Sequence, residues 1–109
     1  MIRLGLAMAA AAVITMPLPA VAQAGNAFSQ KLRSLPDLQR RAVLRRAVLD
    51  SGQRCKRVDT GALKGRYKNL IMWTATCNPG GSYGVFIGPD GSVQVRPCAD
   101  MRTLKLPPC

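Results

Sequence analysis

Four cysteines are the residues of this chain best suited to chemistry. They stand at Cys55, Cys77, Cys98 and Cys109, and no two of them form a C-x-x-C pair. The chain also contains no histidine, so neither a zinc site nor a dithiol redox site has its usual ligands. An even number of cysteines in a short exported chain instead predicts two disulfides.

Catalytic groups are scarce. Without histidine or glutamate, the remaining general bases are Asp37, Asp50, Asp59, Asp90 and Asp100. Asp37 suits a helix start and Asp90 a turn, no two aspartates have the spacing of an acid/base dyad, and no serine has a base partner. No phosphate-binding glycine motif occurs. We therefore expect a protein that is not an enzyme, with no catalytic residue, no metal and no cofactor.

Arginine is the most conspicuous side chain. The chain has 16 basic and 5 acidic residues, a net charge of +11, and two arginine pairs lie one helical turn apart at Arg40, Arg41, Arg45 and Arg46. Such a charge favours association with anionic partners. We predict these four arginines as binding residues, with a merely solvated basic surface as the alternative.

The first residues have the pattern of an export signal. Arg3 precedes an apolar run from Leu4 to Met16, which is too short to span a bilayer, and Ala20-Val21-Ala22 is a small-x-small cleavage site. We predict a signal peptide at 1–22, a lead or short helix at 23–34 and one small domain at 35–109. A periplasmic or secreted location follows, with no transmembrane segment in the mature chain.

The clearest helix runs from about 36 to 51. Ser34 and Asp37 resemble a capping box, and Ser51-Gly52 provides the stop. Leu35, Leu38, Ala42 and Leu49 form one apolar stripe, which we expect to face the core, while Leu44 and Val48 lie nearly opposite. Those two residues are either covered by a short N-terminal helix, with 27–33 as the candidate, or form a patch for a partner.

A β-meander follows the helix. The segment 54–60 is a candidate first strand, and Lys56 and Arg57 are expected to protect its edge as charged residues. The turns Asn78-Pro79-Gly80-Gly81 and Pro89-Asp90-Gly91 separate three further strand-like runs between 69 and 98. If both turns are tight, Trp73 pairs with Phe86 and Phe86 with Val95. This register predicts a core made of Leu38, Ala42, Ile71, Trp73, Phe86, Val93 and Val95. The fold class is α+β, a helix on a three- or four-stranded antiparallel meander with two disulfides.

The same register addresses the disulfides. Four cysteines allow three pairings, but Cys77 and Cys98 fall on outer strands and face opposite ways, about 9.5 Å apart. That separation exceeds the usual Cα distance of a disulfide. We predict Cys55–Cys77 and Cys98–Cys109.

These residues also carry a resemblance. Cys55, Trp73-x-Ala75-x-Cys77, Tyr83-Gly84-Val85-x-Ile87, Asp90-Gly91 and Val95-x-x-Cys98 resemble small uncharacterised secreted or periplasmic proteins of Gram-negative bacteria. The resemblance implies a fold and a compartment, and it transfers no activity, ligand or site residue.

The leading hypothesis is a non-enzymatic periplasmic interaction domain. It would bind a protein or an anionic envelope surface through the basic helix and the mixed outer face of the sheet. The alternatives are an inhibitor of an exported hydrolase that presents the loop 78–82, and a cationic membrane-active protein. Nucleic acid is not an expected partner, because Trp73 and Phe86 are assigned to the core. The sequence sets no oligomeric state.

Overall fold

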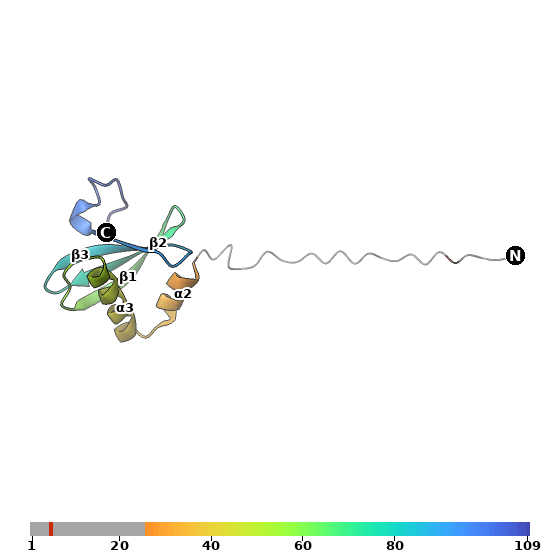
Figure 1. Cartoon of the computed structure of the whole chain (residues 1–109), viewed down its shortest axis with the longest axis horizontal. Coiled ribbons are helices and arrows are strands. Elements are labelled where there is room, and N and C mark those ends of the chain that lie inside the picture. The colour runs from red at the N-terminus through yellow and green to blue at the C-terminus, as the bar shows by residue number, and fades with distance from the viewer. Residues whose placement is uncertain (1–4, 6–25) are drawn as a thin grey trace.

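Two helices precede a four-stranded sheet. The computed structural model describes residue 5 and residues 26–109, so the predicted signal peptide lies outside the described residues. The elements, shown in Figure 1, are α2 (Ala27–Ser34), α3 (Asp37–Asp50), β1 (Val58–Tyr67), β2 (Leu70–Cys77), β3 (Gly81–Ile87), β4 (Val93–Pro97) and the 3-10 turn η1 (Cys98–Asp100). The strands are antiparallel in the order β1-β2-β3-β4. The predicted helix-plus-meander class is confirmed.

Both helix predictions are confirmed, but one predicted cap is wrong. Asn26 caps α2 by accepting a hydrogen bond from the Ser29 amide at 2.9 Å. Pro36, not Ser34, holds the cap position of α3 and makes no side-chain bond there, since the Ser34 hydroxyl donates to the Lys31 carbonyl instead. At the other end, Gly52 has a φ of 86° and stops α3 as expected.

The helix α3 presents the opposite face from the one predicted. Leu44 and Val48 are 1% and 0% exposed, whereas Leu38 is 72% exposed and Ala42 is also at the surface. Gly61 explains the seating of Leu44, because a Cβ at Gly61 would collide with the Leu44 Cδ1 atom. The assignment of Leu38 and Ala42 to the core is therefore wrong, because the space at Gly61 of β1 accepts the other side of the helix, which carries Leu44.

The predicted strand register is wrong by one residue at each hairpin. Trp73 lies opposite Val85, and Phe86 lies opposite Gln94. The first hairpin loop holds three residues between Cys77 and Gly81, and the second holds five between Ile87 and Val93; neither is the assumed two-residue turn. A one-residue shift moves a whole strand to the other face, so only β3 is reversed, and the two errors cancel between β2 and β4.

The main core lies between the helices and the sheet. It contains Trp73, Ala75, Val85, Val95 and the helix residues Leu44 and Val48, with Ile71 packed half-buried against it. Of the predicted core residues, Trp73 and Val95 are confirmed. Val93 is 47% exposed and lies in an open groove with Phe28 of α2 and Val43 of α3, so its assignment to the core is wrong.

The opposite sheet face carries a second, smaller core. Phe86 is buried there, not in the main core as predicted, together with Met72 and Met101. Met101 comes from the C-terminal tail, which folds over the sheet after β4 (Figure 1). Gly84 makes this possible, because a Cβ at this position would collide with the Met101 Cε atom. With the tail in place, both faces of the sheet carry buried apolar side chains.

Both disulfides are those predicted. Cys55–Cys77 joins the segment after α3 to the end of β2, with a Cα–Cα distance of 5.2 Å. Cys98–Cys109 closes the tail, with a Cα–Cα distance of 5.7 Å. Cys55 and Cys77 are buried in the main core, whereas Cys109 is exposed.

Candidate interaction surface

A groove rich in basic residues lies between α3 and the start of β1. Its volume is about 430 Å³. We name it the cationic groove, and it is lined by Leu38, Arg41, Ala42, Arg45, Lys56, Arg57 and Val58. Four cationic and three apolar side chains thus line the groove, which suits a partner that offers both carboxylates and apolar side chains.

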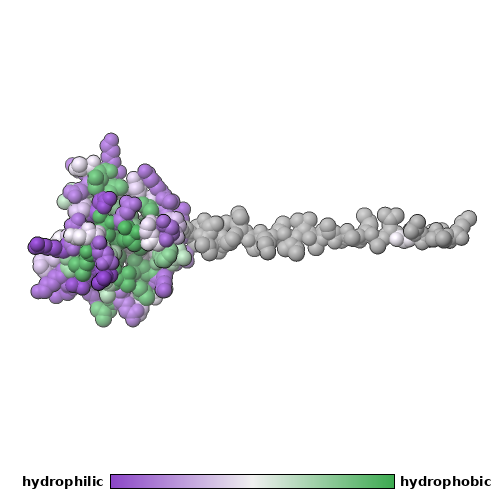
Figure 2. All heavy atoms as spheres, in the orientation of Figure 1, coloured by the Kyte–Doolittle hydropathy of each residue, from purple (hydrophilic) through white to green (hydrophobic). Residues whose placement is uncertain are grey.

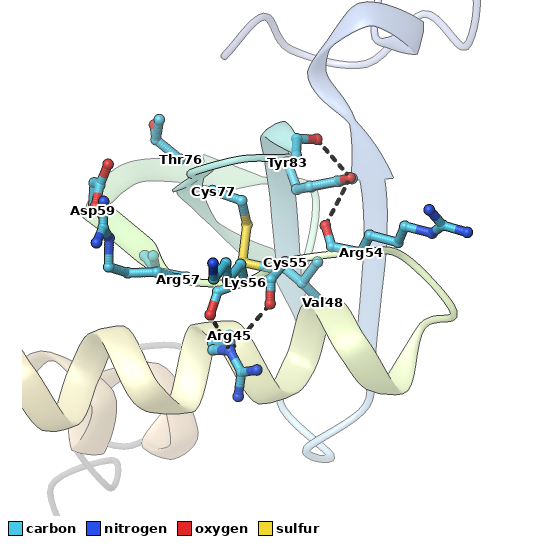
Figure 3. The surroundings of a disulfide bond; sticks show 12 residues. Arg45, Val48, Arg54, Cys55, Lys56, Arg57, Asp59, Thr76, Cys77 and Tyr83 are labelled. Carbon is cyan, nitrogen blue, oxygen red and sulfur yellow. Dashed lines mark hydrogen bonds and ion pairs between the residues drawn. A yellow bond between two sulfur atoms is a disulfide. The ribbon is translucent and has the colours of Figure 1, made fainter.

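Arg45 is the best-placed of these cations. Its Nε donates to the Cys55 carbonyl at 3.1 Å and to the Lys56 carbonyl at 2.9 Å. Figure 3 shows the far end of the guanidinium pointing away from the strands. Because the bonds at Nε fix the plane of the group, the two outer NH₂ groups keep a set direction for a carboxylate or phosphate.

The segment that carries Lys56 and Arg57 is held on several sides. The Cys55–Cys77 disulfide anchors it to β2 (Figure 3), and the Asn78 amide donates to the Arg57 carbonyl at 2.8 Å. The Tyr83 hydroxyl lies 3.2 Å from the Arg54 carbonyl and 3.0 Å from that of Gly80. A segment fixed in this way loses little conformational entropy when it binds a partner.

Two aspartates balance part of the charge in the groove. Arg41 Nε lies 3.0 Å from Asp37 Oδ2, an ion pair without the alignment of a hydrogen bond, and Arg57 Nε donates to Asp59 Oδ1 at 2.8 Å. Hydrogen bonds from Asn78 and then Arg57 lower the pKa of Asp59 below its usual value, so this carboxylate stays ionised. Within residues 26–109, Arg45 and Lys56 have no acidic partner.

The four predicted binding arginines do not act as one group. Arg41 and Arg45 line the cationic groove, whereas Arg46 points outward and pairs with Asp50 at 3.1 Å. Arg40 turns inward, where it bonds the carbonyls of residues 32, 33 and 35 and lies 6.0 Å from the centre of the Trp73 ring. Arg40 therefore joins α2 to α3.

Sequence reasoning missed Lys56 and Arg57 as part of the same surface. It treated them as charges that protect a strand edge. The available signal was their position directly after Cys55, because a disulfide from Cys55 to Cys77 brings that segment beside the arginine helix. The predicted Cys55–Cys77 disulfide was therefore sufficient to place Lys56 and Arg57 in the same surface as the arginines.

Basic and apolar features also occur elsewhere on the domain. A cleft of about 170 Å³ between α2 and the β1–β2 hairpin has Arg33 and Arg66 in its lining, and neither makes an ion pair with a described residue. Beyond the other flank of α3, an apolar groove contains Phe28, Val43 and Val93. Figure 2 shows hydrophobic residues reaching the surface between hydrophilic ones.

Neither a cluster of metal-ligating side chains nor a membrane-spanning helix occurs in the part of the chain that the structure describes. No three potential metal-ligating side chains of histidine, cysteine, aspartate or glutamate type gather there. Nor is any helix among these residues both long and apolar enough to cross a bilayer.

Comparison with protein-family models, with curated proteins and with solved structures finds no match to this chain.

Proposed function

We propose that this protein is a non-enzymatic interaction domain of an exported, oxidising compartment, and that it binds an acidic segment of another protein through the cationic groove. Two disulfides and the signal-like N-terminal sequence support the compartment. The observation that carries the binding proposal is Arg45, whose guanidinium is fixed by backbone carbonyls on a disulfide-anchored segment.

The apolar part of the lining favours a protein over a plain anionic surface. Leu38 lines the groove and is 72% exposed, and a partner that covers it gains apolar burial in addition to charge pairing. Lipid headgroups would meet the cations alone. The combination of cationic and apolar side chains on this surface therefore fits an acidic segment that also carries apolar side chains.

A crosslinking experiment in intact cells tests the proposal. One variant carries a photoreactive residue in place of Leu38. A second variant of the same protein carries it in place of Leu104, an exposed position in the tail. We expect an acidic partner to be captured from position 38 and not from position 104. Capture of the same proteins at both positions would contradict a specific groove.

Charge variants sharpen that test. Arg45→Gln with Lys56→Gln removes two groove cations, and Arg102→Gln with Lys105→Gln removes two cations from the tail. We expect the groove variant to bind the captured partner at least about ten-fold more weakly, the effect of about 1.4 kcal/mol, with little loss in the tail variant. Equal losses would indicate attraction by net charge, as expected for an anionic envelope surface.

A second candidate function rests on the loop between β2 and β3. Asn78, Pro79, Gly80 and Gly81 are all exposed, yet Cys77 and Tyr83 hold the loop at its base. A rigid exposed loop is the form that inhibitors of hydrolases present to their targets. A photoreactive residue at Asn78 that captures a hydrolase, while position 38 captures nothing, would favour this function over the groove.

A further inference from the structure

The strand β1 forms an open edge of the sheet. It is the first strand in the order β1-β2-β3-β4, and among residues 26–109 its backbone is paired along its length only with β2. The helix α3 packs on one face of the sheet and leaves the outer edge of β1 unpaired, apart from a contact of 3.4 Å from Arg41 Nη1 to the Val58 carbonyl. An edge strand of this kind can accept one further strand.

Cationic clefts lie at both ends of this edge. The cationic groove, with Lys56 and Arg57, meets the start of β1 at Val58. The cleft with Arg33 and Arg66 includes Leu63 and Gly65 near its other end. Bulges interrupt β1 between Val58 and Thr60 and between Leu63 and Gly65, and they leave 60–63 and 65–67 in regular register.

The charges select the kind of strand that fits. Lys64 and Arg66 are exposed on β1 itself, so pairing the edge with a second copy would bring like charges together, which destabilises a cross-strand pair. An acidic strand instead has the charge complementary to Lys64 and Arg66.

We infer that the acidic partner segment binds in an extended conformation as a fifth strand on the outer edge of β1, with carboxylates at the cationic groove and at the Arg33–Arg66 cleft. This inference rests on the proposed function and adds the conformation of the partner and a second contact. The ten residues of β1 span about 33 Å, so a partner segment of eight to ten residues, in rough terms, reaches both clefts.

Synthetic peptides test the inference without knowledge of the partner. The probe is a peptide of about ten residues that alternates glutamate and threonine, sized to the strand. The controls are the same peptide with alternate backbone amides methylated and a lysine–threonine peptide. Fluorescence anisotropy measures binding to the mature protein, and amide hydrogen exchange by NMR reports on β1.

Strand addition predicts a distinct set of results. The acidic peptide binds and protects the outward amides of β1 from exchange, methylation abolishes binding, and the lysine–threonine peptide does not bind. Arg33→Gln with Arg66→Gln weakens binding about ten-fold, as does the groove variant, whereas the matched tail variant Arg102→Gln with Lys105→Gln does not.

Other results would overturn the inference, and they separate it from the proposed function. If the acidic peptide binds and only the groove variant weakens it, with no effect of methylation and no protection of β1, strand addition is wrong and the groove proposal stands. If no acidic peptide binds while crosslinking from position 38 captures a partner, strand addition is again wrong. If binding falls equally in every charge variant, both proposals are wrong.

Discussion

Single glycines show how closely the segments of this small domain approach one another. Gly80 has a φ of 139°, and a Cβ built on it would lie 2.9 Å from the Arg54 carbonyl oxygen. That oxygen belongs to the backbone of the segment anchored by Cys55 and cannot move aside as a side chain could. Only glycine fits between the β2–β3 loop and this segment.

Gly80→Ala should therefore destabilise the protein by about 2–3 kcal/mol, from backbone strain at a positive φ together with a steric clash. Urea unfolding followed by Trp73 fluorescence measures the change. Gly52→Ala is the control, because Gly52 has a φ of 86° but no atom within 4 Å of a built Cβ, and we expect about 1 kcal/mol there. Equal costs at the two positions would show that the Arg54 carbonyl is not a constraint.

A buried polar chain is the other feature at the scale of single residues. Asn26 is 2% exposed; its side-chain amide donates to the Ile87 carbonyl at 2.7 Å, and the Trp73 indole donates to the Ser29 hydroxyl at 3.0 Å. The prediction of a lead or short helix at 23–34 did not include these bonds. The two bonds join residues that are 61 and 44 positions apart in the sequence, and such distant contacts cannot be predicted from the pattern of neighbouring residues.

At the scale of elements, α3 shows why helix identity is easier to predict than helix orientation. Its boundaries follow from the run without glycine or proline and from the Ser51-Gly52 stop, which are local signals. Its orientation does not, because apolar residues lie on both sides of the helix. The choice depends on Gly61, 17 positions beyond Leu44, which makes room for that leucine.

The pair Leu44→Ala and Leu38→Ala tests this orientation. Leu44 is 1% exposed and Leu38 is 72% exposed, so we expect a loss of about 2–5 kcal/mol at Leu44 and less than about 0.5 kcal/mol at Leu38. Thermal or urea unfolding provides the measurement. A large cost at Leu38 with a small one at Leu44 would restore the orientation expected from the sequence.

The strands illustrate a related limit. The order of the meander and the disulfide pairing were predictable. Each hairpin loop was assigned the wrong length, but the two errors compensate, so β2 and β4 still present the expected residues to the same face of the sheet. The face of β3 was not predictable, because it depends on each loop separately. The second core was missed for the same reason, since Phe86 was assigned to the wrong side of the sheet.

The C-terminal tail depends on its disulfide to cover that second core. Replacing Cys98 and Cys109 together by serine opens a loop of 11 residues in sequence separation, and we expect a loss of about 2–3 kcal/mol. Met72, Phe86 and Met101 should then become accessible, detected as increased binding of a hydrophobic dye. A variant that keeps dye binding and stability unchanged would show that packing of Met101 and Leu106 alone holds the tail.

The candidate site could be predicted only in part. Arginine at residues 41 and 45 was identified from spacing on a helix, and both line the groove. Arg40 could not be set apart from them, because its three carbonyl acceptors lie at the α2–α3 joint, and the angle between two helices is a tertiary property. Lys56 and Arg57 enter the groove only through the disulfide.

At the scale of the whole molecule, charge is the dominant feature. Residues 26–109 hold every charged residue of the chain except Arg3, which leaves a net charge of +10, one less than the +11 of the full chain. The three ion pairs in this part of the protein are i,i+4 or i,i+2 contacts, and each has at least one side chain that is more than 60% exposed. Such pairs contribute little to stability. Repulsion among the remaining cations should outweigh them.

This balance gives the sign of the response to salt. Added salt screens both the ion pairs and the repulsion. Because unpaired cations outnumber paired ones, we expect the free energy of unfolding to rise by about 1 kcal/mol between roughly 20 and 500 mM sodium chloride. Urea unfolding at several salt concentrations measures it. The variant Arg102→Glu with Lys105→Glu reverses two charges and lowers the net charge of residues 26–109 from +10 to +6. Its stability should therefore depend less on salt. If stability instead falls as salt is added, the ion pairs at Asp37, Asp50 and Asp59 outweigh the repulsion, and the excess cations are too far apart to act on the fold.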